Sequence, residues 1–458
     1  MSKFSSLEHR VPLEIDNVSV TCNDQLCKKC KLCIKACTNV AGVYPLYDLS
    51  KNGDHGVCIN CGQCRIACPF NAITEVSNID LVEEALNDKD IITVFLTAPA
   101  VRVSLGDAFG APSGTNVESK MVSALKSLGA DYVLDVTMGA DLTIMEEAAE
   151  LFERIKNKKN LPMYTSCCPG WVKFAELFYP DMLDNLSTCK SPIAMQATCV
   201  KTYFAAKNKL NPESIRVISI TPCTAKKFEC DREELNAGMR SLGLNGKDCD
   251  ISITTNEFAN MIKKHNLDFL NLEGKEFDSL LGTGSGAGLI FGNSGGVTEA
   301  CLRTLYYYIN GKNIESKDFI KFEAVRGLDY VKEANVDIGE YNLSVCVCNK
   351  MAEAKKVIDE IRAGTRNYDF IEVMACEGGC ANGGGQIKIL KKPLIEEAKL
   401  NRNKTLYETD EKMKIRYCHE NPNIKELYDN YLISPLSEKS HELLHTSFVD
   451  RSYEVNEK

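Results

Sequence analysis

The sequence predicts an α/β fold in which a small domain organised by metal precedes a larger layered domain. Nine of the 22 cysteines lie within residues 21–85, a region with little hydrophobic periodicity. After this region, apolar β-rich runs alternate with amphipathic helical stretches, which is the pattern of largely parallel strands connected by helices. A chain of 458 residues can hold two or three domains with one large buried core.

The individual elements follow from the apolar runs and their period. The runs expected to form strands are Ile91–Thr97, Tyr132–Val136, Met163–Ser166, Arg216–Ile220, Leu343–Val347 and Phe370–Met374. The stretches expected to form helices include Asn116–Leu128, Leu142–Lys156, Gly170–Phe178 and Lys350–Arg362. After about Gly385 the chain becomes charged, and a peripheral, patchily helical tail packed on the main domain is expected. We therefore divide the chain into a leader at 1–20, a metal-binding domain at 21–85, an α/β domain at 86–385 and a tail at 386–458.

Composition narrows the classes of partner and the compartment. The net charge is -9, whereas a domain that binds nucleic acid usually has a basic face, so no nucleic acid is expected. The first residues lack the apolar stretch of a signal peptide, and no run approaches the roughly eighteen apolar residues of a membrane span. A cytoplasmic protein with reduced thiols and no membrane partner is expected, and clustered cytosolic cysteines more often bind metal than form disulfides.

Two runs of cysteines near the N-terminus repeat the Cys-x2-Cys-x2-Cys-x3-Cys spacing of bacterial ferredoxins. The fourth cysteine of each run in such proteins binds the other cluster. The first [4Fe–4S] cluster is therefore assigned to Cys27, Cys30, Cys33 and Cys68. The second is assigned to Cys58, Cys61, Cys64 and Cys37. Zinc also suits Cys-x2-Cys pairs, but eight ligands in two such runs do not form a zinc-finger pattern.

A second set of cysteines lies in three short segments, at 165–171, 221–229 and 374–385, each of which follows a strand candidate. In an open α/β fold the carboxyl ends of the strands line one crevice, where ligands bind. Loops from three strands can therefore converge and present four thiolates to a third iron–sulfur site, which the N-terminal clusters would supply with electrons. The alternative is that these cysteines are small buried hydrophobic residues. Four of them in three loops rich in Gly and Pro favour the metal site.

The same three segments resemble the signature loops of the [FeFe]-hydrogenases. They read TSCCPGW at 165–171, TPCTAKKFE at 221–229 and MACEGGCANGGG at 374–385. Further segments similar to this family occur in the expected order at 98–102, 140–147, 285–292, 419–422 and 441–445. The resemblance covers essentially the whole chain. It implies a ferredoxin-like 2[4Fe–4S] domain, an H-cluster domain of two parallel-sheet α/β lobes, and a C-terminal belt similar to the small subunit of this family.

The resemblance also implies a cofactor and its ligands. The H-cluster of the family is a [4Fe–4S] cube joined through one cysteine sulfur to a di-iron unit that carries CO, CN⁻ and a bridging azadithiolate. The implied ligands of the cube are Cys168, Cys223, Cys376 and Cys380, with Cys380 as the bridge. The implied surroundings of the di-iron unit are Ala98, Pro99, Ser191, Thr221, Pro222, Phe291 and Met374. Lys226 would hydrogen-bond a cyanide ligand, as a charge-assisted donor.

A path for protons is implied in the same way. The residues that match the relay of the family are Cys167, Glu147, Ser187, Glu150 and, near the outer end, Arg154. Glu147 and Glu150 are three residues apart on an expected helix, and Arg154 is four beyond Glu150, which suits an ion pair. On spacing alone, a solvated helix face explains these three residues better than a relay does. The resemblance reverses that preference.

Two positions depart from the common pattern of the family. Thr221 stands where many members have a methionine close to the di-iron unit, and Ile193 stands where many have a polar glutamine. We expect altered redox tuning or catalytic bias from these changes, without a predicted sign.

The resemblance implies reversible interconversion of protons, electrons and H2, with ferredoxin or a similar carrier as redox partner and maturation enzymes as the source of the di-iron unit. One alternative places the same chemistry in a multi-subunit complex. Others are an H2 sensor and an iron–sulfur assembly homologue with little turnover. Sensors usually carry a signalling domain and often lose the thiol found here as Cys167. The cysteines left over are expected to be packing residues, mostly buried: Cys22, Cys189, Cys199, Cys230, Cys249, Cys301, Cys346, Cys348 and Cys418.

Overall fold

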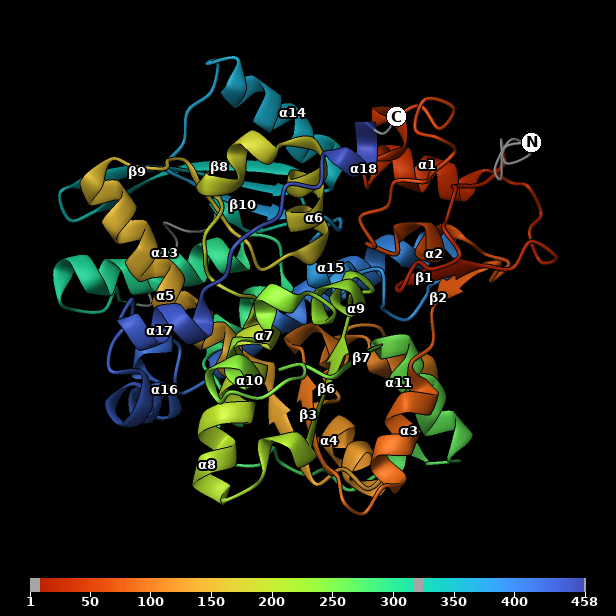
Figure 1. Cartoon of the computed structure of the whole chain (residues 1–458), viewed down its shortest axis with the longest axis horizontal. Helices are drawn as coiled ribbons and strands as arrows, with labels where there is room; N and C mark the ends of the chain where they lie inside the picture. The colour runs from red at the N-terminus through yellow and green to blue at the C-terminus, as the bar shows by residue number, and fades with distance from the viewer. Residues whose placement is uncertain (1–8, 316–323, 457–458) are drawn as a thin grey trace.

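Two four-stranded sheets organise the chain in the computed structural model, which describes residues 9–315 and 324–456 (Figure 1). The first sheet is parallel throughout and has the order β4 (Tyr132–Asp135), β3 (Ile92–Thr97), β6 (Ile215–Thr221), β7 (Ile251–Thr254). The second has the order β5 (Met163–Tyr164), β10 (Phe370–Met374), β9 (Tyr341–Asn349), β8 (Val331–Ile338). Only its β8–β9 pair is antiparallel. Each sheet with its helices forms one lobe.

The central strands are apolar and buried on both faces, as parallel strands covered by helices require. All five residues of β10 are buried, as are the last five of β3. The helices α5 (Val136–Asn157), α7 (Pro192–Cys199), α12 (Gly286–Leu289) and α13 (Gly296–Asn310) pack together beside the sheets. The carboxyl ends of β6 and β10 lie close to each other, because residues that follow both strands line one cavity.

The N-terminal domain is a small unit with little regular structure, drawn in red in Figure 1. Strand β1 (Val20–Cys22) pairs antiparallel with β2 (Ile73–Glu75), and the short helices α1 (Leu32–Asn39) and α2 (Gln63–Ala67) lie against each other. Helix α3 (Ile79–Asn87) then leads into β3. The cysteine-bearing segments occupy the core of this unit.

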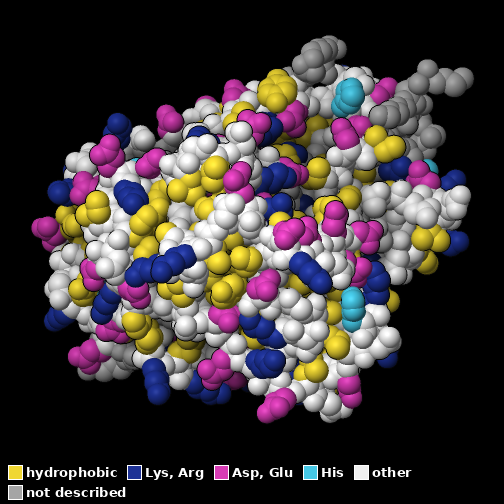
Figure 2. Space-filling view, turned by 60° about the horizontal axis from the view of Figure 1, so that its bottom comes forward, with side chains coloured by type: hydrophobic (Ala, Val, Ile, Leu, Met, Phe, Trp, Pro, Cys, Tyr) yellow, Lys and Arg dark blue, Asp and Glu magenta, His cyan; other side chains and the backbone are white. Residues whose placement is uncertain are grey.

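The remaining helices cover the lobes and connect the strands. They are α4 (Glu118–Ser127), α6 (Pro169–Phe178), α8 (Ala205–Asn208), α9 (Ala225–Cys230), α10 (Ala237–Ser241), α11 (Thr255–Lys264) and α14 (Met351–Arg362). Within the described residues, no helix is long and apolar enough to cross a membrane. On the face seen in Figure 2, Lys and Arg side chains are interspersed with Asp and Glu side chains rather than gathered in one area.

The C-terminal tail begins with a 21-residue helix, α15 (Lys392–Lys412), and continues through α16 (Pro422–Leu427), α17 (Glu438–Leu444) and α18 (Tyr453–Asn456). Asn403 on α15 donates to the backbone carbonyl of Gly378 at 2.9 Å. Near the end of the chain, the carbonyl of Glu454 accepts a hydrogen bond from Asn52 of the N-terminal domain at 3.2 Å. The tail thus runs from the central loops across both lobes and ends beside the N-terminal domain (Figure 1).

All six expected strands and all four expected helices are present; the strand Phe370–Met374 has the expected ends, and the ends of the others differ. The expected strand Met163–Ser166 ends at Tyr164. Helix α5 starts at Val136 rather than Leu142, because the Asp135 side chain accepts a hydrogen bond from the Thr137 backbone N–H and caps the helix directly after β4. The tail, expected to be patchily helical, starts with one continuous helix.

Candidate active site

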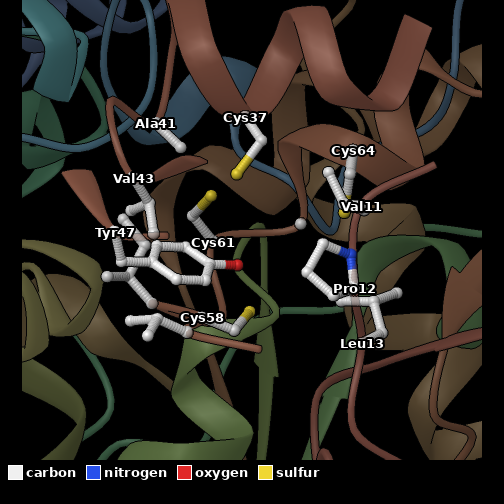
Figure 3. A pocket seen from close by; sticks show the side chains of 13 residues that line it. Val11, Pro12, Leu13, Cys37, Ala41, Val43, Tyr47, Cys58, Cys61 and Cys64 are labelled. Carbon is white, nitrogen blue, oxygen red and sulfur yellow. The ribbon is translucent and has the colours of Figure 1, made fainter. Parts of the chain in front are cut away.

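Four cysteines surround a cavity in the N-terminal domain, shown in Figure 3. Cys37, Cys58, Cys61 and Cys64 line it together with apolar residues such as Val43, and its empty volume is about 410 Å³. Cys37 comes from the first cysteine run and the other three come from the second. The structure therefore brings together the four cysteines that the spacing assigns to the second cluster.

The other four ligand candidates lie closer to the surface. Cys33 and Cys68 are buried in the small N-terminal core, Cys27 is half-buried beside them, and Cys30 is exposed. Burial raises the pKa of the Cys33 thiol, and the neighbouring Cys30 and Cys27 sulfurs raise it further, while backbone N–H groups oppose the rise. A metal cluster held by these cysteines would reach the protein surface at Cys30.

A second cavity lies in the middle of the molecule, with an empty volume of about 420 Å³. We call it the four-cysteine cavity after the ligand candidates Cys168, Cys223, Cys376 and Cys380, and Cys61 and Cys167 line it as well. Cys168 precedes α6, Cys223 follows β6, and Cys376 and Cys380 follow β10. Each loop leaves the carboxyl end of a strand, so the crevice of the two lobes gathers all four sulfurs as the sequence predicts.

Glycines let the last loop pack closely against its neighbours. A Cβ on Gly383 would lie 2.2 Å from the carbonyl oxygen of Pro222. A Cβ on Gly384 would lie 2.0 Å from the carbonyl oxygen of Cys61 in the N-terminal domain. Any side chain at these two positions would push the β10 loop away from the second loop and from the N-terminal domain.

The N-terminal domain is joined to the central cavity by several polar contacts. The Gln63 side chain donates to the Cys376 sulfur at 3.2 Å, and Cys61 lines the central cavity as well as its own. Arg65 donates to the carbonyl of Gly384 at 3.1 Å and is held by an ion pair with Glu75. The second cluster site is thus in direct contact with the four-cysteine site. The sequence did not reveal Gln63 or Arg65, because each contact spans more than 300 residues.

The donor set fits an iron–sulfur cluster. Burial raises the pKa of Cys376 to about 12 and holds that of Cys380 well above its usual value, so thiolates there need a cation close by. The Cys168 sulfur accepts from the Ala375 backbone N–H at 3.4 Å, as ligand sulfurs commonly do. Four soft sulfur ligands in the interior of the protein suit iron–sulfur chemistry.

A further cavity of about 530 Å³ adjoins the four-cysteine cavity, and Cys380 and Cys223 border both. Of the residues implied for the di-iron unit, those that line this cavity are Ala98, Pro99, Thr221, Pro222, Phe291 and Met374. Ile193 lines it too. Lining residues that were not assigned to this site from the sequence are Ala100, Val136, Ala140, Pro192 and Gly292, which are apolar or small. Ala100, Ala140 and Gly292 lie in segments that resemble the family, whereas Val136 and Pro192 do not.

Ser191 does not line this cavity. It caps α7 by accepting from the Ala194 backbone N–H, and its hydroxyl donates to Glu229 at 3.0 Å. Glu229 in turn accepts from the Lys226 ammonium at 2.6 Å. Burial alone would lower the pKa of Lys226, but the Glu229 carboxylate outweighs it and the pKa is raised. Lys226 therefore presents a charged donor to the cavity, and Ser191 supports it through Glu229.

The residues implied for a proton path extend from this cavity toward the surface. Cys167 lines the cavity and is buried. Glu147 is fully buried on α5, and neither of its carboxylate oxygens has a hydrogen-bond partner within the described residues. Burial and the nearby Glu150 charge raise the pKa of Glu147 to about 8, while the neighbouring Ser187 hydroxyl, which donates its hydrogen bond to Glu150, opposes the rise. Because Glu147 is buried, a solvated helix face does not describe this part of α5.

The outer part of the path is closely connected. Ser187 donates to one Glu150 oxygen at 3.0 Å, and Arg154 donates to the other at 2.6 Å. Arg154 also donates to the carbonyl of Leu186 at 2.8 Å and is half-buried. The structure therefore brings all five implied residues into one region between the cavity and the surface.

The cysteines left over behave mostly as packing residues. All 22 cysteines lie in the described part of the chain, and none is in a disulfide. Cys346 and Cys348 face the same side of β9, with their sulfurs 3.6 Å apart. Eight of the nine are buried and Cys22 is half-buried.

The two ferredoxin-type groups of cysteines adjoin a third, buried group of cysteines, and this third group borders a largely apolar cavity. This arrangement defines an iron–sulfur redox enzyme. Comparison with family models places residues 91–384 in the iron-only hydrogenase large subunit, C-terminal domain. Residues 396–451 match the iron hydrogenase small subunit and residues 53–74 a 4Fe-4S binding domain. The chain belongs to the [FeFe]-hydrogenase family, and its cofactors are [4Fe–4S] clusters and an H-cluster.

Individual relatives agree with this family. The chain is 42% identical over 450 residues to the NADP-reducing hydrogenase subunit HndD of Solidesulfovibrio fructosivorans, covering 93% of this chain and 73% of the relative. It is 41% identical over 443 residues to iron hydrogenase 1 of Clostridium pasteurianum, covering 94% and 76%. A structure of the [FeFe]-hydrogenase HydA1 from Chlamydomonas reinhardtii matches with a TM-score of 0.70 and 37% identity, covering 82% of this chain and 99% of that one.

Iron–sulfur assembly proteins are more distant. The cytosolic iron-sulfur assembly component 3 of Bos taurus is 27% identical over 405 residues. The chain is therefore a hydrogenase that interconverts protons, electrons and H2, and the expectation of a hydrogenase is confirmed.

Proposed function

We propose that this hydrogenase moves protons along Cys167, Glu147, Ser187 and Glu150, with Arg154 at the outer end. The observation that carries this proposal is the buried Glu147, whose carboxyl group has no hydrogen-bond partner in the described chain and lies between the cavity and Glu150. A buried carboxyl group without a structural partner is costly, and a proton-carrying role accounts for it.

In this path each residue holds or passes a proton at a defined atom. The Glu150 carboxylate takes a proton at the outer end, where Arg154 fixes its position. The Ser187 hydroxyl, which donates to Glu150, passes a proton inward by accepting one and releasing its own. Glu147 carries the proton through the dry region, and the Cys167 thiol delivers it to the cavity. Groups that titrate near the working pH exchange protons in both directions.

Cys168, Cys223, Cys376 and Cys380 would hold the cube, and Cys380 would bridge to the di-iron unit. When bound, the H-cluster supplies the redox-active iron at which H2 is formed or split. Lys226 would donate a charge-assisted hydrogen bond to a cyanide, with Glu229 and Ser191 holding its ammonium in place. The walls of the cavity are largely apolar, which disfavours water near the site.

Electrons would enter at the exposed Cys30 and leave the second cluster beside Cys376. Four exposed lysines stand in the same segment as Cys30, at 28, 29, 31 and 35. A positive patch next to the outermost cluster favours a negatively charged one-electron carrier, such as a ferredoxin. A cytoplasmic location with reduced thiols suits a carrier of this kind. A second arrangement, as one subunit of a larger complex, is favoured by the relative that is named as a subunit of an NADP-reducing hydrogenase.

The carrier site is tested with Lys31→Glu. Reversing this charge should raise the KM for reduced ferredoxin several-fold, and the effect should shrink at high salt because exposed charges are screened. Activity with reduced methyl viologen, a cation, should not fall. Lys404→Glu, on the exposed side of α15, is the matched control. An unchanged KM for ferredoxin in Lys31→Glu would contradict docking at this patch.

The cofactor assignment is tested on anaerobically purified protein with and without a supplied di-iron unit. Without maturation enzymes the protein should contain only cubane clusters and be inactive. With the di-iron unit it should evolve H2 from reduced methyl viologen, and Cys380→Ala should not retain the unit. A fully loaded protein without turnover would instead indicate a sensor, and failure to accept the unit would indicate an assembly or electron-carrier role.

A further inference from the structure

Three side chains able to bind a metal meet beside the outer end of the proposed proton path. Glu150, Cys189 and His445 each offer a ligand atom, and these atoms lie within 4.8 Å of one another. All three residues are buried. They come from α5, from the segment before α7 and from the residue that follows α17, so the cluster forms only when the tail packs on the catalytic domain. The proposed proton path uses Glu150 but not Cys189 or His445.

His445 is oriented as a metal ligand would be. One ring nitrogen, Nε2, lies 3.2 Å from a Glu146 carboxylate oxygen, and the other, Nδ1, lies 2.7 Å from the Thr188 hydroxyl. Glu146 is itself fixed by the Tyr428 hydroxyl at 2.6 Å and by a backbone N–H at 2.8 Å. A carboxylate that accepts from one nitrogen leaves the lone pair on the other, which is the usual support of a histidine bound to zinc. Nδ1 therefore faces the cluster as the ligand atom.

The distances suit a small tetrahedral ion. The Cys189 sulfur lies 3.7 Å from a Glu150 oxygen. With metal–sulfur and metal–oxygen bonds of about 2.3 and 2.0 Å, two tetrahedral ligand atoms are about 3.5 Å apart. The Thr188 hydroxyl now stands between Nδ1 and Glu150, at 2.7 and 3.2 Å, and an ion would take its place.

The charge of the pocket favours a cation. Glu146, Glu147 and Glu150 all belong to one stretch of α5, and Arg154 is the cationic side chain that contacts Glu150. His441 is exposed, and its ring contacts that of His445 in a tilted arrangement, with centroids 4.2 Å apart. The exposed His441 ring is thus a direct neighbour of the ligand candidate His445.

We propose that Glu150, Cys189 and His445 form a binding site for Zn²⁺ or a similar divalent ion, and that the bound ion closes the proton path. Binding replaces the Cys189 proton by a metal–sulfur bond and releases that proton to solvent, and a water completes the tetrahedron. The ion occupies the Glu150 carboxylate, which then no longer accepts protons. The inhibitory part rests on the proposed relay through Glu150, whereas the binding part does not.

The test is a Zn²⁺ titration of H2 evolution by the fully loaded enzyme with reduced methyl viologen. Zn²⁺ should inhibit, and a chelator should restore activity. Cys189→Ala and His445→Asn should keep their activity without zinc but need at least tenfold more zinc for half-inhibition. Cys199→Ala, another buried cysteine near α7, should behave like the wild type. Equal zinc sensitivity in all four proteins would overturn the proposal.

X-ray absorption of the bound zinc identifies the ligands directly. The wild type should show one sulfur at about 2.3 Å with nitrogen or oxygen neighbours at about 2.0–2.1 Å. A spectrum dominated by several sulfurs would place the zinc at a cluster site and overturn the proposal. One-sulfur zinc that is lost in Cys189→Ala but does not slow H2 evolution would support the metal site and contradict the relay through Glu150.

Discussion

The electron side and the proton side of the central cavity consist of different chemical groups. On the electron side, sulfur atoms and backbone groups approach closely: Gln63 reaches the Cys376 sulfur, and Gly384 packs against the carbonyl of Cys61. On the proton side, carboxyl and hydroxyl groups lie one after another, from Glu147 to Glu150. Electrons cross short gaps without a chain of specific groups, whereas a proton needs an exchangeable group at every step. Single substitutions should therefore cost far more on the proton side.

The largest effect is expected from Glu147→Gln. The amide keeps the size of the side chain but cannot carry a proton through the relay, so H2 evolution should fall by about 10²- to 10⁴-fold, the range of a lost acid–base group. Glu153→Gln, on the exposed side of the same helix, is the control and should change activity little. Assays with reduced methyl viologen on cofactor-loaded protein measure both. Near wild-type activity in Glu147→Gln would remove this residue from the path.

The next effect concerns pH. With the pKa of Glu147 at about 8, the group is protonated below that pH, so H2 evolution should decline and H2 oxidation should rise as pH passes through about 8. Glu150→Gln removes the negative charge beside Glu147 and lowers the pKa of Glu147, so the decline of H2 evolution with pH should begin at lower pH in this variant. Turnover should also be slower, because the Glu150 carboxylate is missing. Glu150→Asp keeps the charge and should leave the pH of this decline unchanged. The measurement is the pH dependence of H2 evolution by the wild type, Glu150→Gln and Glu150→Asp. A decline at the same pH in all three proteins would contradict the coupling between the two carboxyl groups.

A smaller effect is expected on the electron side. Gln63→Leu removes the N–H···S hydrogen bond to Cys376, which stabilises the added negative charge of a reduced cube. The reduction potential of the cube should become more negative, while H2 evolution should change only a few-fold. Potentiometric titration followed by electron paramagnetic resonance measures the potential, and the exposed Gln25→Leu is the control. A loss of H2 evolution in Gln63→Leu as large as that in Glu147→Gln would contradict the expected difference between the electron side and the proton side.

The smallest effect is expected at Thr221, which lines the cavity. Its hydroxyl donates to the Cys223 carbonyl at 2.8 Å, so it stiffens the second loop. Thr221→Val removes this hydrogen bond at constant shape, typically worth about 1 kcal/mol, and Thr221→Met also adds a thioether to the cavity. The ratio of H2 oxidation to H2 evolution should differ between wild type and Thr221→Met by less than the change in H2 evolution caused by Gln63→Leu. Unchanged kinetics in both directions, with an unchanged potential, would show that Thr221 does not tune the site.

The sequence predicted the parts of the fold and site that depend on local pattern. Strand–helix alternation gave the α/β lobes, and cysteine spacing grouped Cys37 with the second run. Strand β8 was missed because it is an edge strand with polar residues on both faces, and the edge strand β7 was missed as well. Helix α15 is polar nearly all round, so its length was not visible in the periodicity.

Contacts between distant segments could not be predicted in the same way. Gln63 and Cys376 are 313 residues apart, and His445 and Glu146 are 299 apart, so neither pair leaves a local pattern. Ser191 was assigned to the surroundings of the di-iron unit by resemblance, and the structure adds a contact that no motif indicates, the hydrogen bond from Ser191 to Glu229, which also accepts from Lys226. Such details follow from packing rather than from motifs.

The most direct test of the account is H2 evolution by Cys167→Ala in protein whose di-iron unit is shown to be present by its CO and CN⁻ infrared bands. The account predicts a loss of at least about 100-fold, because alanine cannot deliver a proton to the cavity. Cys199→Ala should retain full activity. Turnover within a few-fold of the wild type in loaded Cys167→Ala would contradict the thiol relay.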